Sequence, residues 1–121
     1  MLNRVSIQGR LVSTPELRHS TSDIAVTTFT LAVGRSYVKK GEERLTDFVD
    51  VVAWRSIAEF ICRNFSKGQM IIVTGAIQTR TYTGDDGKNR KVTEVVADNA
   101  YFCDAKKKDQ DVEESDDDWL D

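Results

Sequence analysis

Two large aromatic residues fall on one side of a segment that is predicted to be a strand, Asp47 to Trp54. Successive strand side chains point to opposite faces, so small aliphatic residues at positions 49, 51 and 53 would face a core. The other face would then carry Phe48, Asp50, Val52 and Trp54. Exposed rings can stack on flat π-systems such as nucleic-acid bases, at ~1–3 kcal/mol per base. Parity alone equally allows Phe48 and Trp54 to pack beneath a loop or a neighbouring subunit.

Cations accompany aromatic rings at two further places in the sequence. Gln78, Arg80 and Tyr82 share one parity, and Arg35 lies two residues before Tyr37. A groove for single-stranded nucleic acid needs charge for phosphates and flat apolar surface for bases, so this interleaving favours such a groove. Other cations could extend the track, although each alone is typical of a solvated surface: Arg4, Arg10, Arg55, Lys67 and Lys88.

The sequence offers no residues for catalysis, and we expect no enzymatic activity. Cys62 and Cys103 lack CxxC spacing and are predicted to be buried, reduced thiols. The single histidine, His19, lies in a polar stretch and is predicted to be a solvated loop residue. Neither GxGxxG nor GxxxxGK[ST] occurs, so no phosphate-binding loop, metal site or cofactor is predicted.

Charge is divided unevenly along the 121 residues. Residues 106–121 hold three lysines against eight acidic residues, a net charge of −5, which leaves +2 for residues 1–105 out of the total of −3. A mildly basic body can bind nucleic acid while an acidic tail repels or mimics it. The 40% apolar content suits a single domain, and the absence of a signal or a long apolar run predicts a soluble cytoplasmic protein.

The elements that must hold these residues are mainly strands, because apolar residues alternate through the first hundred positions. A polar connection follows Pro15 as far as Asp23, and Asp86-Gly87 predicts a hairpin turn. The predicted strands are Val5–Leu11, Ala25–Arg35, Thr46–Trp54, Met70–Tyr82, Arg90–Val96 and a short Ala100–Cys103.

One segment, from Ser56 to Phe65, changes to helical periodicity. Its apolar stripe is predicted to face the core, with Ser56 as the N-cap and Lys67-Gly68 closing the helix. Three strands, a helix, a long hairpin and an edge strand are the order of an OB-fold, a five-stranded Greek-key barrel. The same order leaves other small mixed domains possible. We therefore predict an all-β domain with one helix over residues 1–105, followed by a disordered linker and acidic tail over 106–121.

Several blocks spread over residues 1 to about 103 resemble the bacterial single-stranded DNA-binding protein family. They include Gly9-Arg10-Leu11, Phe29-Thr30-Leu31-Ala32-Val33, Val51-Val52-Ala53-Trp54-Arg55 and Thr79-Arg80-Thr81-Tyr82. The resemblance implies an OB-fold that assembles as a homotetramer, a dimer of dimers, and wraps single-stranded DNA during replication, recombination and repair. By segment match, the four stacking positions of that family fall on Tyr37, Phe48, Trp54 and Tyr82.

The resemblance also implies that the acidic C-terminal tip recruits replication, recombination and repair proteins. Here the tip is Asp116-Asp117-Asp118-Trp119-Leu120-Asp121, whereas the family usually ends in Asp-Asp-Asp-Ile-Pro-Phe. The charged last residue and the short linker depart from the family pattern and place docking to the usual partners in doubt. Both departures would suit a phage, plasmid or secondary chromosomal version.

Two other functions remain open from the sequence. An OB-fold of the primosome accessory type would bridge replication proteins, although such proteins generally lack an acidic tail. An RNA-binding module of the cold-shock kind would show more clustered aromatic residues on adjacent strands.

Overall fold

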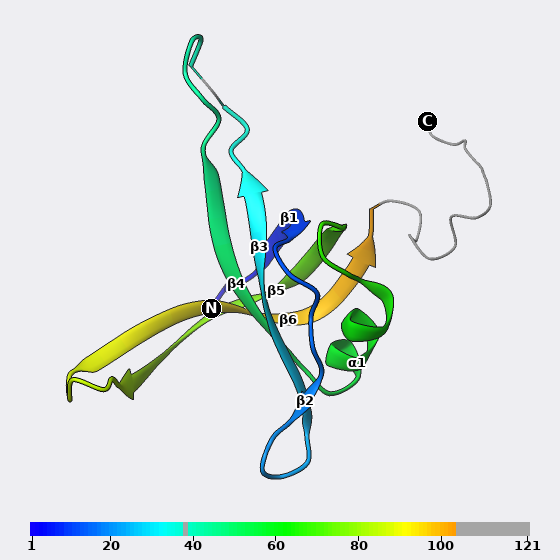
Figure 1. Ribbon diagram of the computed structural model, residues 1–121, viewed down its shortest axis with the longest axis vertical. Coiled ribbons are helices and arrows are strands. Elements are labelled where there is room, and N and C mark those ends of the chain that lie inside the picture. The colour runs from blue at the N-terminus through cyan, green and yellow to red at the C-terminus, as the bar shows by residue number, and fades with distance from the viewer. Residues whose placement is uncertain (38, 104–121) are drawn as a thin grey trace.

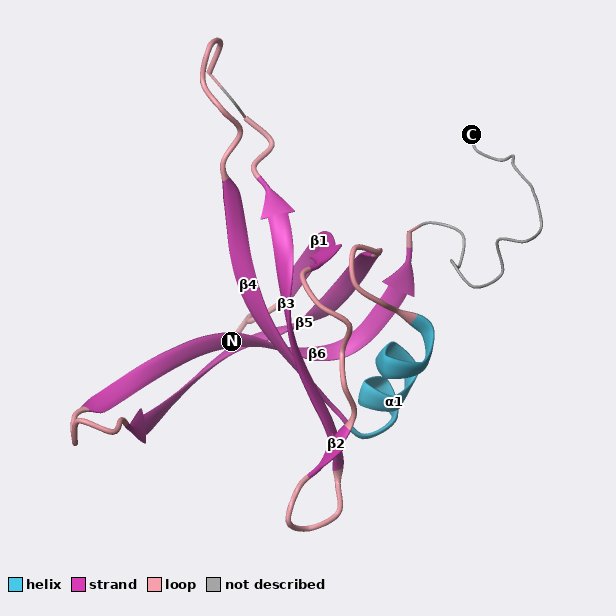
Figure 2. Ribbon diagram, in the orientation of Figure 1, coloured by secondary structure: helices cyan, strands magenta, loops and turns pink. Residues whose placement is uncertain are grey.

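The computed structural model describes residues 1–37 and 39–103. Within these residues the chain forms six strands and one helix (Figures 1 and 2). Their bounds are β1 Val5–Leu11, β2 Arg18–His19, β3 Ala25–Gly34, β4 Thr46–Trp54, α1 Arg55–Asn64, β5 Met70–Thr83 and β6 Asn89–Phe102. The predicted tail, including the Asp116 to Asp121 tip, lies outside the described residues.

Five of the strands close into a barrel in the order β1-β5-β6-β4-β3. Closure comes from β3 returning to β1, where Arg10 pairs with Ala32 and Leu11 with Leu31. The β4–β6 contact is parallel, and the other pairings are antiparallel. This connectivity is the Greek-key barrel of the OB-fold, so the predicted fold class is confirmed.

The inward row of each strand fills the barrel, as the alternation predicts. Leu31, Val51 and Val73 are almost completely buried, together with Ile61 from α1. The helix thereby packs against β3, β4 and β6 of the barrel (Figure 1). Just beyond the helix, the ring of Phe65 stacks on that of Phe102 at 4.8 Å between centroids. The helical stripe is therefore core, as predicted.

The prediction of two strands over 90–103 is wrong, because β6 is continuous. Asp98 and Asn99 are both exposed, which interrupts the alternation, and the pairing with β5 shifts register between Thr74 and Gly75. A β-bulge absorbs one extra residue without ending the strand. Gly75 makes this possible, since a Cβ there would lie 2.1 Å from the carbonyl oxygen of Val96.

The predicted helix ends also need correction. The helix begins at Arg55 with Trp54 as its N-cap, and no side chain caps it, so Ser56 lies inside the first turn. It ends at Asn64, before Lys67-Gly68. Gly68, at a φ of +85°, instead serves the turn that leads into β5, where its N–H donates to the carbonyl of Leu11 at 2.8 Å.

Other local differences concern exposed residues. Arg18 and His19 form the short strand β2 against β3 within the predicted connection, although His19 is exposed as expected. Burial of both thiols is not confirmed. Cys62 on α1 is half-buried, and Cys103 is exposed because it follows the last residue of β6.

Candidate nucleic-acid interface

The four aromatic side chains singled out from the sequence are exposed. Fractional exposure is 77% for Tyr37, 67% for Phe48, 43% for Trp54 and 47% for Tyr82. Phe48 and Trp54 lie on the same face of β4, six residues apart, which corresponds to ~20 Å along a strand. Neither ring is sealed in the core, so both are available to a ligand.

The strand pairing explains why Phe48 stands clear of the barrel. Its cross-strand partner on β3 is Ala32, whose partner on β1 is Arg10. Directly paired residues share a face, so Arg10, Ala32 and Phe48 form one outward row across three strands. The small alanine leaves the ring uncovered and places a cation two strands away from it.

Val52 shares the outward parity of Phe48 and Trp54 and lies outside the core cluster, but its side chain is only 6% exposed. It occupies a central position on β4, paired with Thr28 on one side and with Val96 of the parallel strand β6 on the other. The exposed rings therefore mark the two ends of the outward face of β4.

Tyr37 and Tyr82 belong to two hairpin arms that extend from the barrel in different directions (Figure 1). Tyr37 lies in the connection between β3 and β4, and Tyr82 lies near the end of β5. The structure thus places the four rings on one strand and two arms, and it does not bring them into contact with one another.

Three of the arginines predicted to bind phosphate are already held by carboxylates. Arg35 makes a two-pronged contact with Asp47, at 3.0 Å from Nε and 2.9 Å from Nη2. Arg80 Nε donates to Glu94 at 3.1 Å. Arg4 contacts Asp98 at 2.5 Å. Phosphate must compete with a carboxylate at each of these positions.

These contacts lower the pKa of two of the carboxyl groups below their usual value. For Asp47 the main cause is the hydrogen bond from Arg35, which outweighs the opposing effect of desolvation. For Asp98 the main cause is the hydrogen bond from Arg4, followed by one from the Thr74 hydroxyl. Both carboxylates therefore stay charged at neutral pH.

The remaining predicted cations are exposed. Arg10 donates to the carbonyl of Gly68 at 3.1 Å, which directs it toward the start of β5. Arg55 directly follows Trp54 and has a φ of +61°. Lys67 lies in the turn that leads into β5, and Lys88 lies at the tip of the β5–β6 hairpin.

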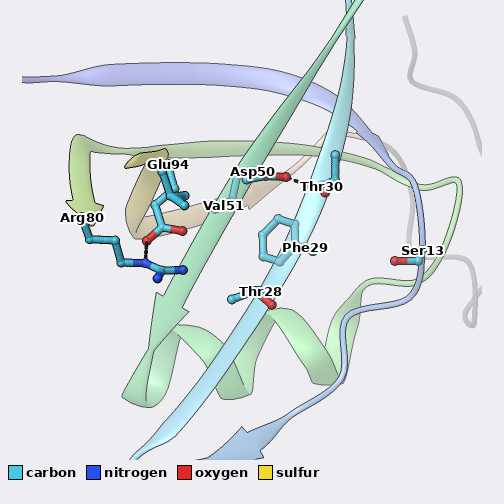
Figure 3. A pocket seen from close by; sticks show the side chains of 9 residues that line it. Ser13, Thr28, Phe29, Thr30, Asp50, Val51, Arg80 and Glu94 are labelled. Carbon is cyan, nitrogen blue, oxygen red and sulfur yellow. Dashed lines mark hydrogen bonds and ion pairs between the residues drawn. The ribbon is translucent and has the colours of Figure 1, made fainter. Parts of the chain in front are cut away.

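The sequence did not predict a polar recess on the barrel face that carries Phe48 and Trp54. It has a volume of about 340 Å³ and lies where β3, β4 and the β5–β6 hairpin meet (Figure 3). Thr30 donates to Asp50 at 2.8 Å, and the Arg80–Glu94 pair contributes the facing wall. The even parity of Asp50 beside Phe48 and Trp54 is a signal that could have placed it there. Glu94 could not be placed from the sequence, because its position depends on the β4–β6 pairing.

Two negative findings hold for the part of the chain that the structure describes. It contains no cluster of three or more His, Cys, Asp or Glu side chains that could hold a metal ion. Its helix is neither long nor apolar enough to cross a membrane.

An OB barrel with exposed rings and cations on one face belongs to the class of oligonucleotide-binding OB-fold proteins. Comparison with known families is more specific, because residues 2–103 match the model of the "Single-strand binding protein family". The chain belongs to this family.

Similar proteins carry matching names. A "Single-stranded DNA-binding protein" of Caldanaerobacter subterraneus subsp. tengcongensis is 48% identical over 106 residues, which cover 88% of this chain and 71% of the relative. "Single-stranded DNA-binding protein 2" of Listeria monocytogenes is 45% identical, covering 88% of this chain and 66% of the relative. A Bacillus cereus "Single-stranded DNA-binding protein" is 45% identical, covering 84% and 60%. The chain thus spans roughly two thirds of the length of these relatives.

Proposed function

We propose that this protein binds single-stranded DNA largely without regard to sequence, by stacking bases on Tyr37, Phe48, Trp54 and Tyr82. The exposure of Phe48 and Trp54 on one face of β4 carries the proposal. A ring stacks on any base because every base has a π-face, so this mode of binding tolerates all sequences. Family membership and the names of the similar proteins point the same way.

The phosphates of the bound strand are neutralised by the surrounding cations. These are Arg4, Arg10, Arg35, Arg55, Lys67, Arg80 and Lys88. Arg10 is the best placed of them, because it shares an outward row with Phe48. Neutralisation releases counterions, so affinity should fall as the salt concentration rises.

The protein is further proposed to act as a homotetramer, a dimer of dimers. Support comes from β1, which pairs with β3 only through Arg10 and Leu11. From Val5 to Gly9, the edge of β1 away from β5 pairs with no other described strand. An open edge can pair with the same strand of a second copy, giving a dimer whose association yields the tetramer.

The cellular role that fits these properties is the protection of exposed DNA strands during replication, recombination and repair. The proposal includes a cytoplasmic, nucleoid-associated location. The acidic tip, Asp116 to Asp121, is proposed to recruit partner proteins of these processes. Its support is the run of three aspartates followed by Trp119 and Leu120.

Titration with oligo-dT tests the central proposal. The chain has two tryptophans, Trp54 and Trp119, so a Trp119→Phe background lets Trp54 report alone. Stacking of a base on Trp54 should quench its emission in proportion to complex formation. Unchanged emission together with no complex at low salt would rule the proposal out.

A further inference from the structure

The polar recess described above contains two carboxylates that the stacking mechanism does not use. Asp50 lies on β4 and Glu94 on β6, each two residues before a directly paired residue, Val52 and Val96. Because residues two apart on a strand share a face, both carboxylates point to the outward side. Figure 3 shows the Thr30–Asp50 and Arg80–Glu94 pairs around the recess.

Each carboxylate is oriented by one donor and keeps one oxygen for a ligand. Thr30 occupies Oδ1 of Asp50, and Arg80 occupies Oε1 of Glu94. The hydrogen bonds among the described residues leave Oδ2 and Oε2 open. The Glu94 side chain is only 14% exposed, so an incoming donor would meet it in a partly desolvated setting where a hydrogen bond gains strength.

The charge of the recess selects which part of a DNA strand can enter it. Two carboxylates against the single guanidinium of Arg80 give the recess a net charge of −1, so phosphate is repelled inside it and Arg80, whose side chain is 60% exposed, can meet a phosphate only outside it. Asp50 lies two residues from Phe48 along β4, ~7 Å, and four residues from Trp54, ~13 Å. A strand stacked on these rings would therefore pass the recess and present a base edge to it.

Base edges differ in what they offer a carboxylate. Cytosine, adenine and guanine carry exocyclic amino groups, and Asp or Glu accepts a hydrogen bond from the N4 amino group of cytosine. Thymine and uracil offer a carboxylate only N3–H at this edge, between two carbonyl oxygens that would repel it, whereas the N4 amino group of cytosine has an acceptor on one side only. The Watson–Crick edge is free in a single strand, so the recess can discriminate at this edge.

We propose that the recess formed by Asp50, Glu94 and Thr30 is a base-edge subsite that favours nucleobases bearing an exocyclic amino group over 4-oxo pyrimidines. The inference rests on the proposed single-strand binding by the β4 rings. It adds a local bias to a track that otherwise tolerates any sequence. Asp50 is its specificity-determining residue, and Glu94 contributes the second acceptor.

The sharpest test compares oligo-dC with oligo-dU of equal length, since these differ only at the 4-amino or 4-oxo edge and its adjacent ring nitrogen. Oligomers of about 30 nucleotides exceed the length bound by one OB domain. Dissociation constants are measured at neutral pH for the full chain and for Asp50→Asn. The Asn variant keeps an acceptor for Thr30 but adds an amino donor, which suits a carbonyl. The ratio of Kd for oligo-dU to Kd for oligo-dC should fall by about three- to tenfold.

Two further variants separate a base-edge effect from a change in overall charge. Asp47→Asn also removes one negative charge near the rings, but outside the recess; it should tighten binding of both oligomers and leave the ratio unchanged. Glu94→Gln keeps an acceptor for Arg80 and should shift the ratio in the same direction as Asp50→Asn. Melting temperatures close to that of the wild type confirm that the variants are folded.

Each outcome has one meaning. A ratio that falls in the Asp50 and Glu94 variants and stays constant in the Asp47 variant supports the subsite. A ratio that is the same in wild type and Asp50→Asn, or that falls equally in Asp47→Asn, overturns it while binding itself persists. Failure of the wild type to bind either oligomer would instead overturn the proposed function, and the subsite with it.

Discussion

Arg55 follows Trp54 directly and has a φ of +61°, so the chain turns through a left-handed residue at the point where β4 ends and α1 begins. A non-glycine residue in this region costs roughly 1–2 kcal/mol. Strained residues concentrate at functional sites. The turn lets Trp54 remain on the strand face while the chain changes direction into the helix.

We predict that Arg55→Gly separates backbone strain from DNA contact. Glycine adopts a positive φ without steric cost, so stability should rise by about 1 kcal/mol. Loss of the guanidinium should weaken oligo-dT binding and reduce the salt slope by about 0.7, the value for one phosphate contact on a single strand. Thermal unfolding and titrations at several salt concentrations measure both effects. Arg55→Val serves as the opposite control, because a β-branched residue should destabilise this turn. Equal stability of the two variants would show that the backbone at position 55 is not strained.

Removal of the β4 rings should weaken DNA binding. We expect Phe48→Ala and Trp54→Ala each to reduce the binding free energy by ~1–3 kcal/mol per stacked base. The loss should be similar for oligo-dT, oligo-dC and oligo-dA, because a ring stacks on any base. Fluorescence anisotropy of labelled oligonucleotides measures the loss. Tyr101→Ala is the matched control, because Tyr101 is also an exposed ring, at 46%, outside the proposed stacking set. If Tyr101→Ala weakens binding as much as Trp54→Ala, the rings of β4 have no special role.

The contact between Arg35 and Asp47 should limit how well Arg35 binds phosphate. Asp47→Asn removes the charge that holds the guanidinium, so oligo-dT binding should become several-fold tighter at low salt, with the gain shrinking as salt screens it. Glu59→Gln on the exposed side of α1 removes one negative charge without freeing an arginine. A similar gain from Glu59→Gln would show that net charge, rather than the contact with Arg35, sets the affinity.

The Arg4–Asp98 pair should make part of the stability dependent on pH. Contacts with Arg4 and Thr74 lower the pKa of Asp98 in the folded chain, so folding favours the carboxylate form. The resulting stabilisation is present above the unfolded pKa of about 4 and is lost as pH falls through the lower folded value. Asp98→Asn should therefore melt below the wild type at pH 7 and approach it in strong acid. A melting-temperature difference that stays constant between these limits would contradict this linkage.

Alternation of apolar residues predicted the strands around β1, β3 and β4 because each has one buried face. It missed β2, since both of its residues are exposed and carry no such pattern. It divided β6, since the bulge opposite Gly75 places two exposed residues in sequence. The same alternation predicted that Phe48 and Trp54 face outward, because side chains next to buried ones on a strand point to the opposite face. The partners of the arginines could not be predicted, because the contact between Arg80 and Glu94 depends on the register between β5 and β6.

Deletion of residues 109–121 should tighten binding of single-stranded DNA. The deleted segment carries eight acidic residues and no basic ones, which leaves a net charge of +5 on residues 1–108. It should compete with DNA for the same cations, most strongly at low salt where screening is weakest. Oligo-dT affinity is compared between the full chain and the deletion at low and high salt. A chain whose tail keeps the same composition in scrambled order should bind DNA as the full chain does, since the competition depends on charge. Equal or weaker binding after the deletion would exclude competition by the tail.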